Sequence, residues 1–222
     1  MKTGIKICGI TRPEDIEALN AHQVDMAGFV FYKKSPRHLA ETLAPQLAAL
    51  CRPDMMRVAL LVDPSDDDID AVLAAVSPHY IQLHGEETPQ RVAEIKYRSY
   101  ASLIKAVPIS QAADLADTKA YDGLVDMFLF DAKPDADALP GGNGETFDWT
   151  ALSTYENKLP YLLAGGLSAE NVGAALRQTG APMVDISSGV ESAPGQKDKH
   201  LIAAFVAAVR AHDGAPETQA QE

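Results

Sequence analysis

The sequence predicts an α/β fold, a single (β/α)8 TIM barrel with an all-parallel, eight-stranded core. Short apolar runs rich in β-branched and aromatic residues recur at intervals of roughly 20–30 residues, which is the spacing of βα units. A segment with helical character follows each run, and no linker or low-complexity block interrupts the 222 residues. The alternative fold for this alternation is a doubly wound open sheet.

Eight runs are predicted to form the strands, in chain order. They are IKICG (5–9), MAGFVFY (26–32), RVALLVD (57–63), YIQLH (80–84), SLIKAV (102–107), MFLFDA (127–132), YLLAG (161–165) and VDISSG (184–189). This number of strands matches the barrel, and the chain length lies in the lower part of the range for such barrels.

Several of the intervening segments carry helix start or stop signals. TRPEDIEALN places Pro13 and two acidic residues in a first turn, and Ser65 is followed by Asp68 three residues later. In GLSAENVGAALRQTG we expect Ser168 to be the N-cap and Gly180 to end the helix. The last segment, DKHLIAAFVAAVRA, spaces its apolar residues as one face of a helix.

We expect the barrel to span residues 1–211 and the polar tail HDGAPETQAQE (212–222) to be disordered. The net charge of −12 argues against nucleic-acid binding. No apolar run approaches the ~20 residues that span a bilayer, and the N-terminus lacks the apolar core of a signal peptide. The two cysteines, Cys8 and Cys51, form no CxxC motif. A cytoplasmic protein with free thiols is predicted, without a membrane partner.

Polar side chains share one face near the ends of five predicted strands. Side chains alternate between the two faces of a strand. We assign the face of apolar residues in each run to contact with the helices, which leaves the set of residues on the other face for the barrel interior. That set is Lys6, Cys8, Gln82, His84, Lys105, Asp131, Asp185 and Ser187. Catalytic groups of such barrels lie at the carboxyl ends of the strands, so this set contains the candidate site residues.

Taken singly, these residues have other interpretations. Cys8 is equally explained as a small buried residue, Asp131 as a turn residue and His84 as a hydrogen-bonding group of the rim. Inward-facing Lys6 and Lys105 are less easily explained, because a buried ammonium without a partner is costly. In an acidic protein they imply a bound anion or carboxylate partners.

Three glycine-containing segments, 140–149, 164–171 and 187–195, follow the last three predicted strands. Glycine lets backbone N–H groups approach an anion, and loops after the seventh and eighth strands are the usual phosphate site of this fold. The nucleotide P-loop and GxGxxG spacings are absent, which disfavours a nucleoside triphosphate. Ordinary tight turns are the alternative.

A basic segment, FVFYKKSPRHL (29–39), follows the second strand. Its Arg37 suits bidentate binding of a carboxylate, whereas Lys33 and Lys34 are expected to be solvated.

Several longer motifs together resemble the phosphoribosylanthranilate isomerase family of tryptophan biosynthesis. They are KICGIT, GFVFYKKSPRHL, ALLVDPS, IQLHGEE, LFDAK, GGNGETFDW, LAGGLSAENV and VDISSGVESAPGQKD, in this order between Lys6 and Val209. The resemblance implies a barrel without metal or cofactor. It implies an Amadori rearrangement of N-(5-phosphoribosyl)anthranilate to 1-(2-carboxyphenylamino)-1-deoxyribulose 5-phosphate. It also implies that the enzyme is a monomer or a homodimer.

The resemblance also implies roles for individual residues. Cys8 would be the general base, Asp131 the general acid, and Arg37 the residue that binds the anthranilate carboxylate. The remaining substrate-binding residues would be Gln82, His84 and Ser187 at the mouth and, as a phosphate site of backbone amides, Gly142, Gly165, Gly166, Ser188 and Gly189. Asn143 and Ala193 depart from the family's common serine or threonine, and neither is a proposed catalytic group.

This chemistry makes opposite demands on the two catalytic groups. Asp131 must carry its proton near neutral pH, and Cys8 must lose its proton, which requires a pKa below the ~8.5 of a free cysteine. Lys6 lies on the same face and could stabilise the thiolate, or it could pair with Asp185, a weaker catalytic candidate. The alternatives are another phosphosugar barrel, either a histidine-pathway isomerase or an indole-glycerol-phosphate synthase-like enzyme, and a non-catalytic phosphosugar-binding barrel. The Cys–Asp pair argues against these alternatives.

Overall fold

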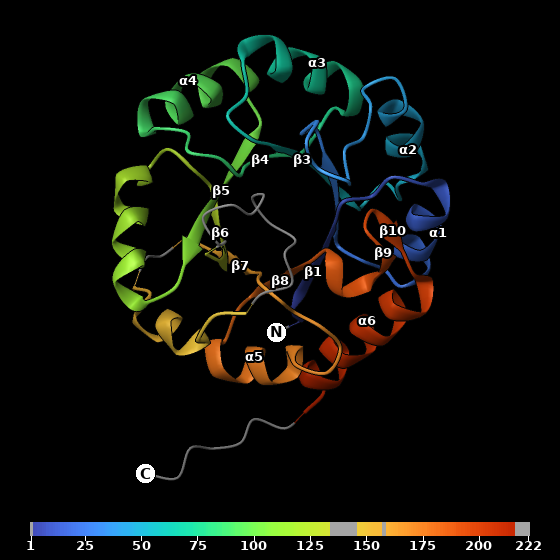
Figure 1. The fold of residues 1–222 in the computed structure, drawn as a ribbon, viewed down its shortest axis with the longest axis vertical. Coiled ribbons are helices and arrows are strands. Elements are labelled where there is room, and N and C mark those ends of the chain that lie inside the picture. Colours follow the sequence, from blue (N-terminus) through green and yellow to red (C-terminus); the bar gives the residue numbers. More distant parts are fainter. Residues whose placement is uncertain (1, 134–145, 157–158, 216–222) are drawn as a thin grey trace.

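The computed structural model describes residues 2–133, 146–156 and 159–215. Within these residues, eight parallel strands form a closed barrel in which each strand pairs with the next and β8 pairs with β1. Figure 1 looks down the barrel, with the helices arranged around the outside. The predicted fold is confirmed, because pairing of the last strand with the first excludes an open sheet.

All eight predicted runs form strands. They are β1 (Gly4–Cys8), β2 (Met26–Val30), β3 (Met56–Leu61), β4 (Tyr80–Leu83), β5 (Ser102–Ile109), β6 (Met127–Ala132), β7 (Tyr161–Leu163) and β8 (Met183–Ile186). Most of the differences lie at the carboxyl ends, where residues such as Tyr32, His84 and Ser187 leave the ladder. These residues begin the loops of the mouth.

The outer layer combines α-helices with 3-10 segments. The helices are α1 (Pro13–Ala21), α2 (Ala44–Leu50), α3 (Asp66–Val76), α4 (Pro89–Ser99), α5 (Val172–Thr179) and α6 (Lys199–Asp213), and the 3-10 segments are η1 (Ala112–Tyr121), η2 (Trp149–Thr154) and η3 (Ser188–Val190). A small antiparallel hairpin, β9 (Glu191–Ala193) and β10 (Gln196–Lys197), precedes α6. Among the described residues, no helix combines the length and apolar character needed to cross a membrane.

Of the helix signals read from the sequence, only the one at Ser168 fails; α1 begins at Pro13, with Glu14 and Asp15 in its first turn. Ser65 caps α3 reciprocally with Asp68, whose backbone N–H donates to Ser65 Oγ at 3.2 Å. Gly180 ends α5 with a positive φ of 62°, a backbone conformation that glycine adopts without strain. Ser168 is not the N-cap that we expected. Helix α5 begins only at Val172, because Asn171 Oδ1 accepts a hydrogen bond from Ser168 N at 2.8 Å and holds a turn there.

The carboxyl end of the barrel domain extends beyond the predicted boundary at residue 211. Helix α6 continues through Asp213, whose Oδ1 accepts hydrogen bonds from Thr3 N at 3.0 Å and Thr3 Oγ1 at 2.6 Å. His212 and Asp213 therefore belong to the fold rather than to the tail that we expected to be disordered. Residues 216–222 of that tail lie outside the described residues.

Two apolar layers hold the barrel. An inner cluster drawn from the strands fills the interior with Met26, Val58, Ile104, Ala106, Met127, Leu129, Leu162 and Ala164. An outer cluster joins the opposite strand faces, including Ile5, Ile7, Phe128 and Phe130, to the surrounding helices. For β1 and β6 the predicted alternation is therefore confirmed.

The alternation is wrong for β5. Ile104 and Ala106 pack in the interior, and their neighbours Leu103 and Val107 pack against the helices. Lys105 therefore lies on the outer face, away from the mouth. The prediction for β5 failed because it assigned the apolar residues Ile104 and Ala106 to contact with the helices. The interior of this barrel is also apolar at these positions.

Lys105 has a carboxylate partner rather than a bound anion. Its Nζ donates to Glu87 Oε2 at 3.0 Å and to the Gly85 carbonyl at 2.7 Å. Both charged side chains are almost completely buried. Glu87 Oε1 accepts hydrogen bonds from Asp63 N at 3.0 Å and Gly85 N at 3.1 Å. The pair thus connects the segments that follow β3 and β4 with β5.

Replacing Glu87 by glutamine is expected to destabilise the fold strongly. The substitution leaves the Lys105 ammonium buried without a countercharge, which typically costs about 3–5 kcal/mol. Urea unfolding at neutral pH measures this change. Asp70→Asn is the matched control, because Asp70 pairs with Arg98 on the exposed surface. It should change the unfolding free energy far less. Equal effects of the two substitutions would contradict the structural role of the buried pair.

Candidate active site

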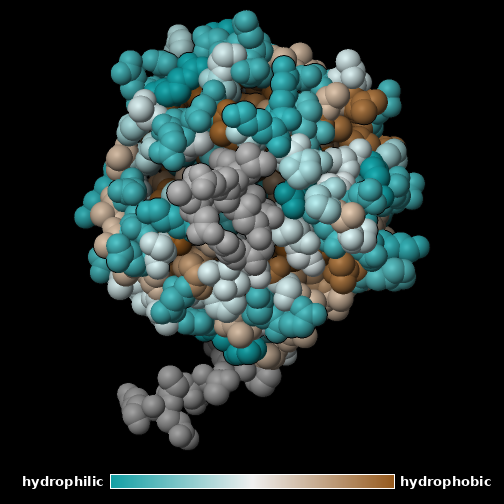
Figure 2. All heavy atoms as spheres, viewed as in Figure 1, coloured by the Kyte–Doolittle hydropathy of each residue, from teal (hydrophilic) through white to brown (hydrophobic). Residues whose placement is uncertain are grey.

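The carboxyl ends of the strands surround a cavity of about 50 Å³. Six predicted site residues line it, namely Cys8, Arg37, Gln82, His84, Asp131 and Ser187. They come from five strands or the segments directly after them, which parallel closure brings to one rim. Figure 2 shows this face of the molecule, where hydrophilic residues cover much of the rim over α3 and α4.

A second cavity of about 190 Å³ adjoins the first. Tyr32, Val62, His84 and Asp131 line both cavities. Tyr32 and Val62 were not singled out in the sequence, because an apolar or aromatic residue at a strand end carries no chemical signal of its own. Asp131 is therefore accessible from both cavities.

Cys8 ends β1 and is only 4% exposed. It stands in register with Gly28 of β2, and a Cβ placed on Gly28 would lie 2.9 Å from Cys8 Sγ. A glycine at position 28 therefore provides the space that the thiol occupies. Burial raises the pKa of the Cys8 thiol, although Lys6 and Lys197 act to lower it. The expected lowering of this pKa is not what the structure shows, because burial outweighs the two cations.

Lys6 lies on the interior face, as predicted, and is completely buried. Its Nζ donates to Asp185 Oδ1 at 2.8 Å, across the strands β1 and β8 that close the barrel. Burial acts to lower the pKa of Lys6, but Asp185 and Cys8 act in the opposite direction and the pKa is raised. Both alternatives left open by the sequence are met, because Lys6 pairs with Asp185 and also acts to lower the pKa of the Cys8 thiol.

Gln82, His84 and Asp131 form a row across the mouth. Gln82 Nε2 lies 2.8 Å from His84 Nδ1, and His84 Nε2 lies 3.5 Å from Asp131 Oδ2. With the amide nitrogen facing Nδ1, the amide donates to that atom and the ring proton lies on Nε2, toward Asp131. Asp131 Oδ1 accepts a hydrogen bond from Ala132 N at 2.9 Å. The acid candidate is thus oriented from two sides.

Arg37 is already paired with a carboxylate of the protein itself. Its Nε donates to Glu191 Oε1 at 2.8 Å and its Nη2 to Glu191 Oε2 at 2.9 Å. A second carboxylate would have to approach the guanidinium along a different edge. Glu191 was missed in the sequence because it lies 154 residues from Arg37, in a hairpin that no local pattern announced. Lys33 and Lys34 are exposed, as expected of solvated residues.

The glycines of the loops after β7 and β8 are not among the residues that line the cavity, whereas Ser187, which begins the loop after β8, is. Gly165 and Gly166 have positive φ values of 84° and 56°. A Cβ on Gly165 would lie 2.8 Å from Ala132 N, and one on Gly189 would overlap the Leu167 carbonyl. The loops after β7 and β8 therefore approach each other closely. Ser188 begins η3, and Gly142 lies outside the described residues.

The sequence profile of a family described as "N-(5'phosphoribosyl)anthranilate (PRA) isomerase" matches residues 5–208 of this chain. The chain belongs to the phosphoribosylanthranilate isomerase family. The family resemblance read from the sequence motifs is thereby confirmed.

Relatives within this isomerase family are similar over nearly their whole length. The N-(5'-phosphoribosyl)anthranilate isomerase of Parvibaculum lavamentivorans is 46% identical over 213 residues, which cover 95% of this chain and 99% of the relative. The crystal structure of phosphoribosyl anthranilate isomerase from Thermotoga maritima superposes with a TM-score of 0.85 at 34% identity, covering 94% of this chain and 99% of that one.

A further solved isomerase of the family holds a ligand. It is phosphoribosyl anthranilate isomerase in complex with reduced 1-(o-carboxyphenylamino)-1-deoxyribulose 5-phosphate. Its TM-score is 0.82 at 32% identity, and the match covers 94% of this chain and 99% of that chain.

Gly28→Ala is expected to displace Cys8 in this isomerase. The new methyl group would lie 2.9 Å from both the Cα and the Sγ of Cys8, and backbone cannot move away as easily as a flexible side-chain end. We expect a loss of about 1–3 kcal/mol in the unfolding free energy together with slower turnover. Gly173→Ala in α5 is the control, since its methyl would meet only the end of Arg177 at 3.4 Å. A Gly28→Ala protein as stable and active as this control would contradict the packing argument.

Proposed function

We propose that the cavity at the carboxyl ends of the strands converts N-(5-phosphoribosyl)anthranilate to 1-(2-carboxyphenylamino)-1-deoxyribulose 5-phosphate, with Asp131 as general acid and Cys8 as general base. Family membership makes the chain an isomerase of tryptophan biosynthesis that interconverts an aldose and a ketose. The observation that carries the residue roles is that Cys8 and Asp131 line one cavity, from opposite parts of the barrel.

The first step opens the sugar ring. Asp131 delivers a proton to the furanose ring oxygen, the bond from that oxygen to C1 breaks, and a Schiff base forms with the anthranilate nitrogen. Asp131 is suited to this step by its position, because it lines both cavities of the mouth and is partly exposed to them. Its contacts with His84 and Ala132 N support its orientation.

The second step moves a proton from C2. The Cys8 thiolate removes it, the electron pair forms an enolamine, and tautomerisation leaves a ketone at C2. A buried thiolate needs nearby positive charge, and Lys6 and Lys197 both act on Cys8 in this sense. General acid–base catalysis of this kind typically contributes about 10²–10⁴-fold per group.

The two charged ends of the substrate fit different parts of the mouth. The loops that carry Gly165, Gly166, Ser188 and Gly189 follow β7 and β8, and backbone N–H groups of such loops are the usual phosphate ligands of this fold. Arg37 lines the cavity from the segment after β2 and would bind the anthranilate carboxylate, as the family resemblance implies.

Gln82 contacts His84 through its amide nitrogen, and its amide oxygen is suited to contact the substrate. Among the described residues, its buried Oε1 has no hydrogen-bond partner, and the side chain lines the cavity. A substrate O–H or N–H would satisfy this atom. In this proposal the protein works in the cytoplasm on a small phosphosugar, as a monomer or homodimer, with free thiols and without metal or cofactor.

The proposed roles predict large and specific losses of activity. Cys8→Ala and Asp131→Asn are each expected to lower kcat by about 10²–10⁴-fold, because each removes one proton-transferring group. The decrease in substrate fluorescence, coupled to the next enzyme of the pathway, measures turnover. Cys51→Ser is the control, since Cys51 lies at the end of α2 and does not line the cavity. Near-native kcat in either site variant would refute its role.

The pH dependence follows from the state of the thiol. Burial raises the pKa of Cys8, and a general base acts only after losing its proton. While Asp131 keeps its proton, as the ring-opening step requires, we therefore expect kcat/KM to rise by about tenfold per pH unit below the pKa of the thiol. Activity is lost as the pH falls. Steady-state kinetics from about pH 6 to 10 measure this limb. Cys8→Ala is the control, and a rising limb that persists unchanged in its residual activity would be incompatible with Cys8 as the base.

A further inference from the structure

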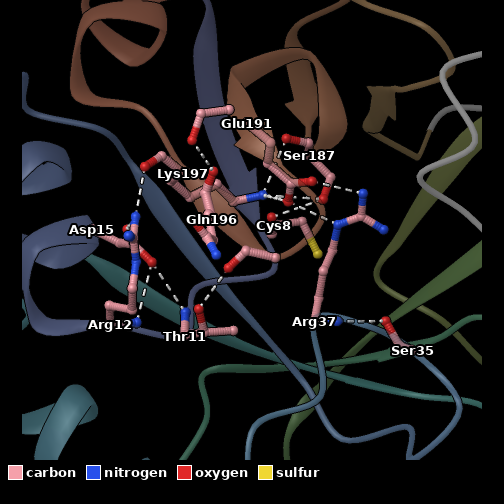
Figure 3. Close-up of polar contacts among 12 residues, drawn as sticks. Cys8, Thr11, Arg12, Asp15, Ser35, Arg37, Ser187, Glu191, Gln196 and Lys197 are labelled. Carbon is pink, nitrogen blue, oxygen red and sulfur yellow. Dashed lines mark hydrogen bonds and ion pairs between the residues drawn. The ribbon is translucent and has the colours of Figure 1, made fainter.

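Lys197, on the hairpin strand β10, has a buried ammonium group next to the mouth. Its Nζ donates to Glu191 Oε1 at 2.6 Å, to the Ser187 carbonyl at 3.1 Å and to Ser187 Oγ at 3.2 Å. An ammonium has three N–H groups, and all three have acceptors here. Figure 3 shows Lys197, Glu191 and Ser187 together beside Cys8 and Arg37.

The contacts of Lys197 lead to both functional parts of the site. Ser187 Oγ donates to the Cys8 carbonyl at 3.0 Å, so Lys197 is connected through Ser187 to the end of β1. Glu191 is shared with Arg37, whose Nε donates to the same oxygen, Oε1, at 2.8 Å. One buried ammonium thus connects the strand end that carries the proposed base with the proposed carboxylate-binding residue.

The hairpin is also held by contacts that do not use the Lys197 side chain. Arg12 Nη2 donates to the Lys197 main-chain carbonyl at 2.6 Å, and Thr11 Oγ1 donates to the Gly195 carbonyl at 2.8 Å. A Cβ on Gly195 would lie 2.6 Å from the Pro36 carbonyl oxygen, so the hairpin also packs closely on the segment after β2. These contacts involve only main-chain atoms of the hairpin. A buried charge at position 197 therefore needs another explanation.

The charged groups around Cys8 differ in how they are compensated. They are Lys6 on β1, Arg37 after β2, His84 after β4, Asp131 on β6, Asp185 on β8, Glu191 on β9 and Lys197 on β10. The charge of Lys6 is opposed by Asp185 at 2.8 Å. Lys197, in contrast, shares the carboxylate of Glu191 with Arg37, so its own charge is less completely compensated.

We propose that Lys197 is a positioning residue of the isomerase site, which stabilises the thiolate form of Cys8 by its charge and holds the end of β1 through Ser187. The inference rests on the proposed role of Cys8 as base. The interaction is reciprocal: Cys8 acts to raise the pKa of Lys197, although burial lowers it, and Lys197 acts to lower that of Cys8. Only the protonated amine satisfies all three acceptors around Nζ, which keeps the charge in place.

The test measures the ionisation of Cys8 directly, without an activity assay. The chain has two cysteines, so Cys8 is the only thiol in a Cys51→Ser background. Thiolate absorbance in the ultraviolet is followed against pH, and the signal of a Cys8→Ala, Cys51→Ser protein is subtracted to remove the tyrosines. Lys197→Met is expected to raise the midpoint by about one pH unit, a tenfold loss of thiolate at fixed pH. The rising limb of kcat/KM should shift equally.

Three further variants separate the effect of the Lys197 charge from the effect of its hydrogen bonds. Lys199→Met removes an exposed lysine two residues away and should leave the midpoint unchanged. Lys197→Gln keeps donors for Ser187 without the charge, should act like Lys197→Met, and serves in its place if that protein does not fold. Glu191→Gln disturbs the same hydrogen bonds but removes a negative charge. It should therefore not raise the midpoint.

The outcomes decide the proposal. A midpoint raised by neutral residues at 197, and not by Glu191→Gln, supports it. An unchanged midpoint in the Lys197 variants overturns the proposal. A raised midpoint in Glu191→Gln also overturns it, because loss of a purely structural contact would have the same effect in the Lys197 and Glu191 variants. Failure of the proposed function has a different signature, namely activity that survives Cys8→Ala whatever the thiolate titration shows.

Discussion

Closure of the parallel barrel between β1 and β8 is the constraint on which the rest of the structure depends. It aligns Lys6 with Asp185 and Ile7 with Ile186. Because all strands run in one direction, closure brings every carboxyl end to one rim. Cys8 and Asp131, 123 positions apart in the chain (131 − 8), line one small cavity only for this reason. No single strand or βα unit contains the site.

The acidic chain accommodates its buried lysines by pairing each of them with a carboxylate. Among the described residues, Lys6, Lys105 and Lys197 are all buried, and each meets a carboxylate from another strand or from the segment between β4 and α4. These partners are Asp185, Glu87 and Glu191. The three pairs differ in position: Lys6–Asp185 crosses the closing seam, Lys105–Glu87 faces the helices, and Lys197–Glu191 lies across the two strands of the β9–β10 hairpin. Burial makes each charge dependent on its partner, because the cost of an unpaired ammonium in the interior is high.

Alternation along the strands predicted much of the site but not all of it. It placed Lys6 and Cys8 on the interior face of β1, and Gln82 on that of β4, because the outer apolar partners there pack against helices. It failed at Lys105, where the inner positions of β5 are apolar as well. A period of two identifies two faces, and it does not state which face is inside when both are buried. The start of α5 was missed for a related reason, since Asn171 competes for the turn that Ser168 would have begun.

The sequence by itself determined the order and spacing of the strands, the family, and Cys8, Asp131 and Arg37 as candidates, because periodicity and motifs are local properties of the chain. Only the tertiary structure decided what these residues meet. Arg37 pairs with Glu191, Lys6 with Asp185, and Lys197 reaches Cys8 through Ser187. Two of these pairings join residues more than 150 positions apart. Burial, which raises the pKa of Cys8, is likewise a property of the closed barrel and not of the IKICGIT segment.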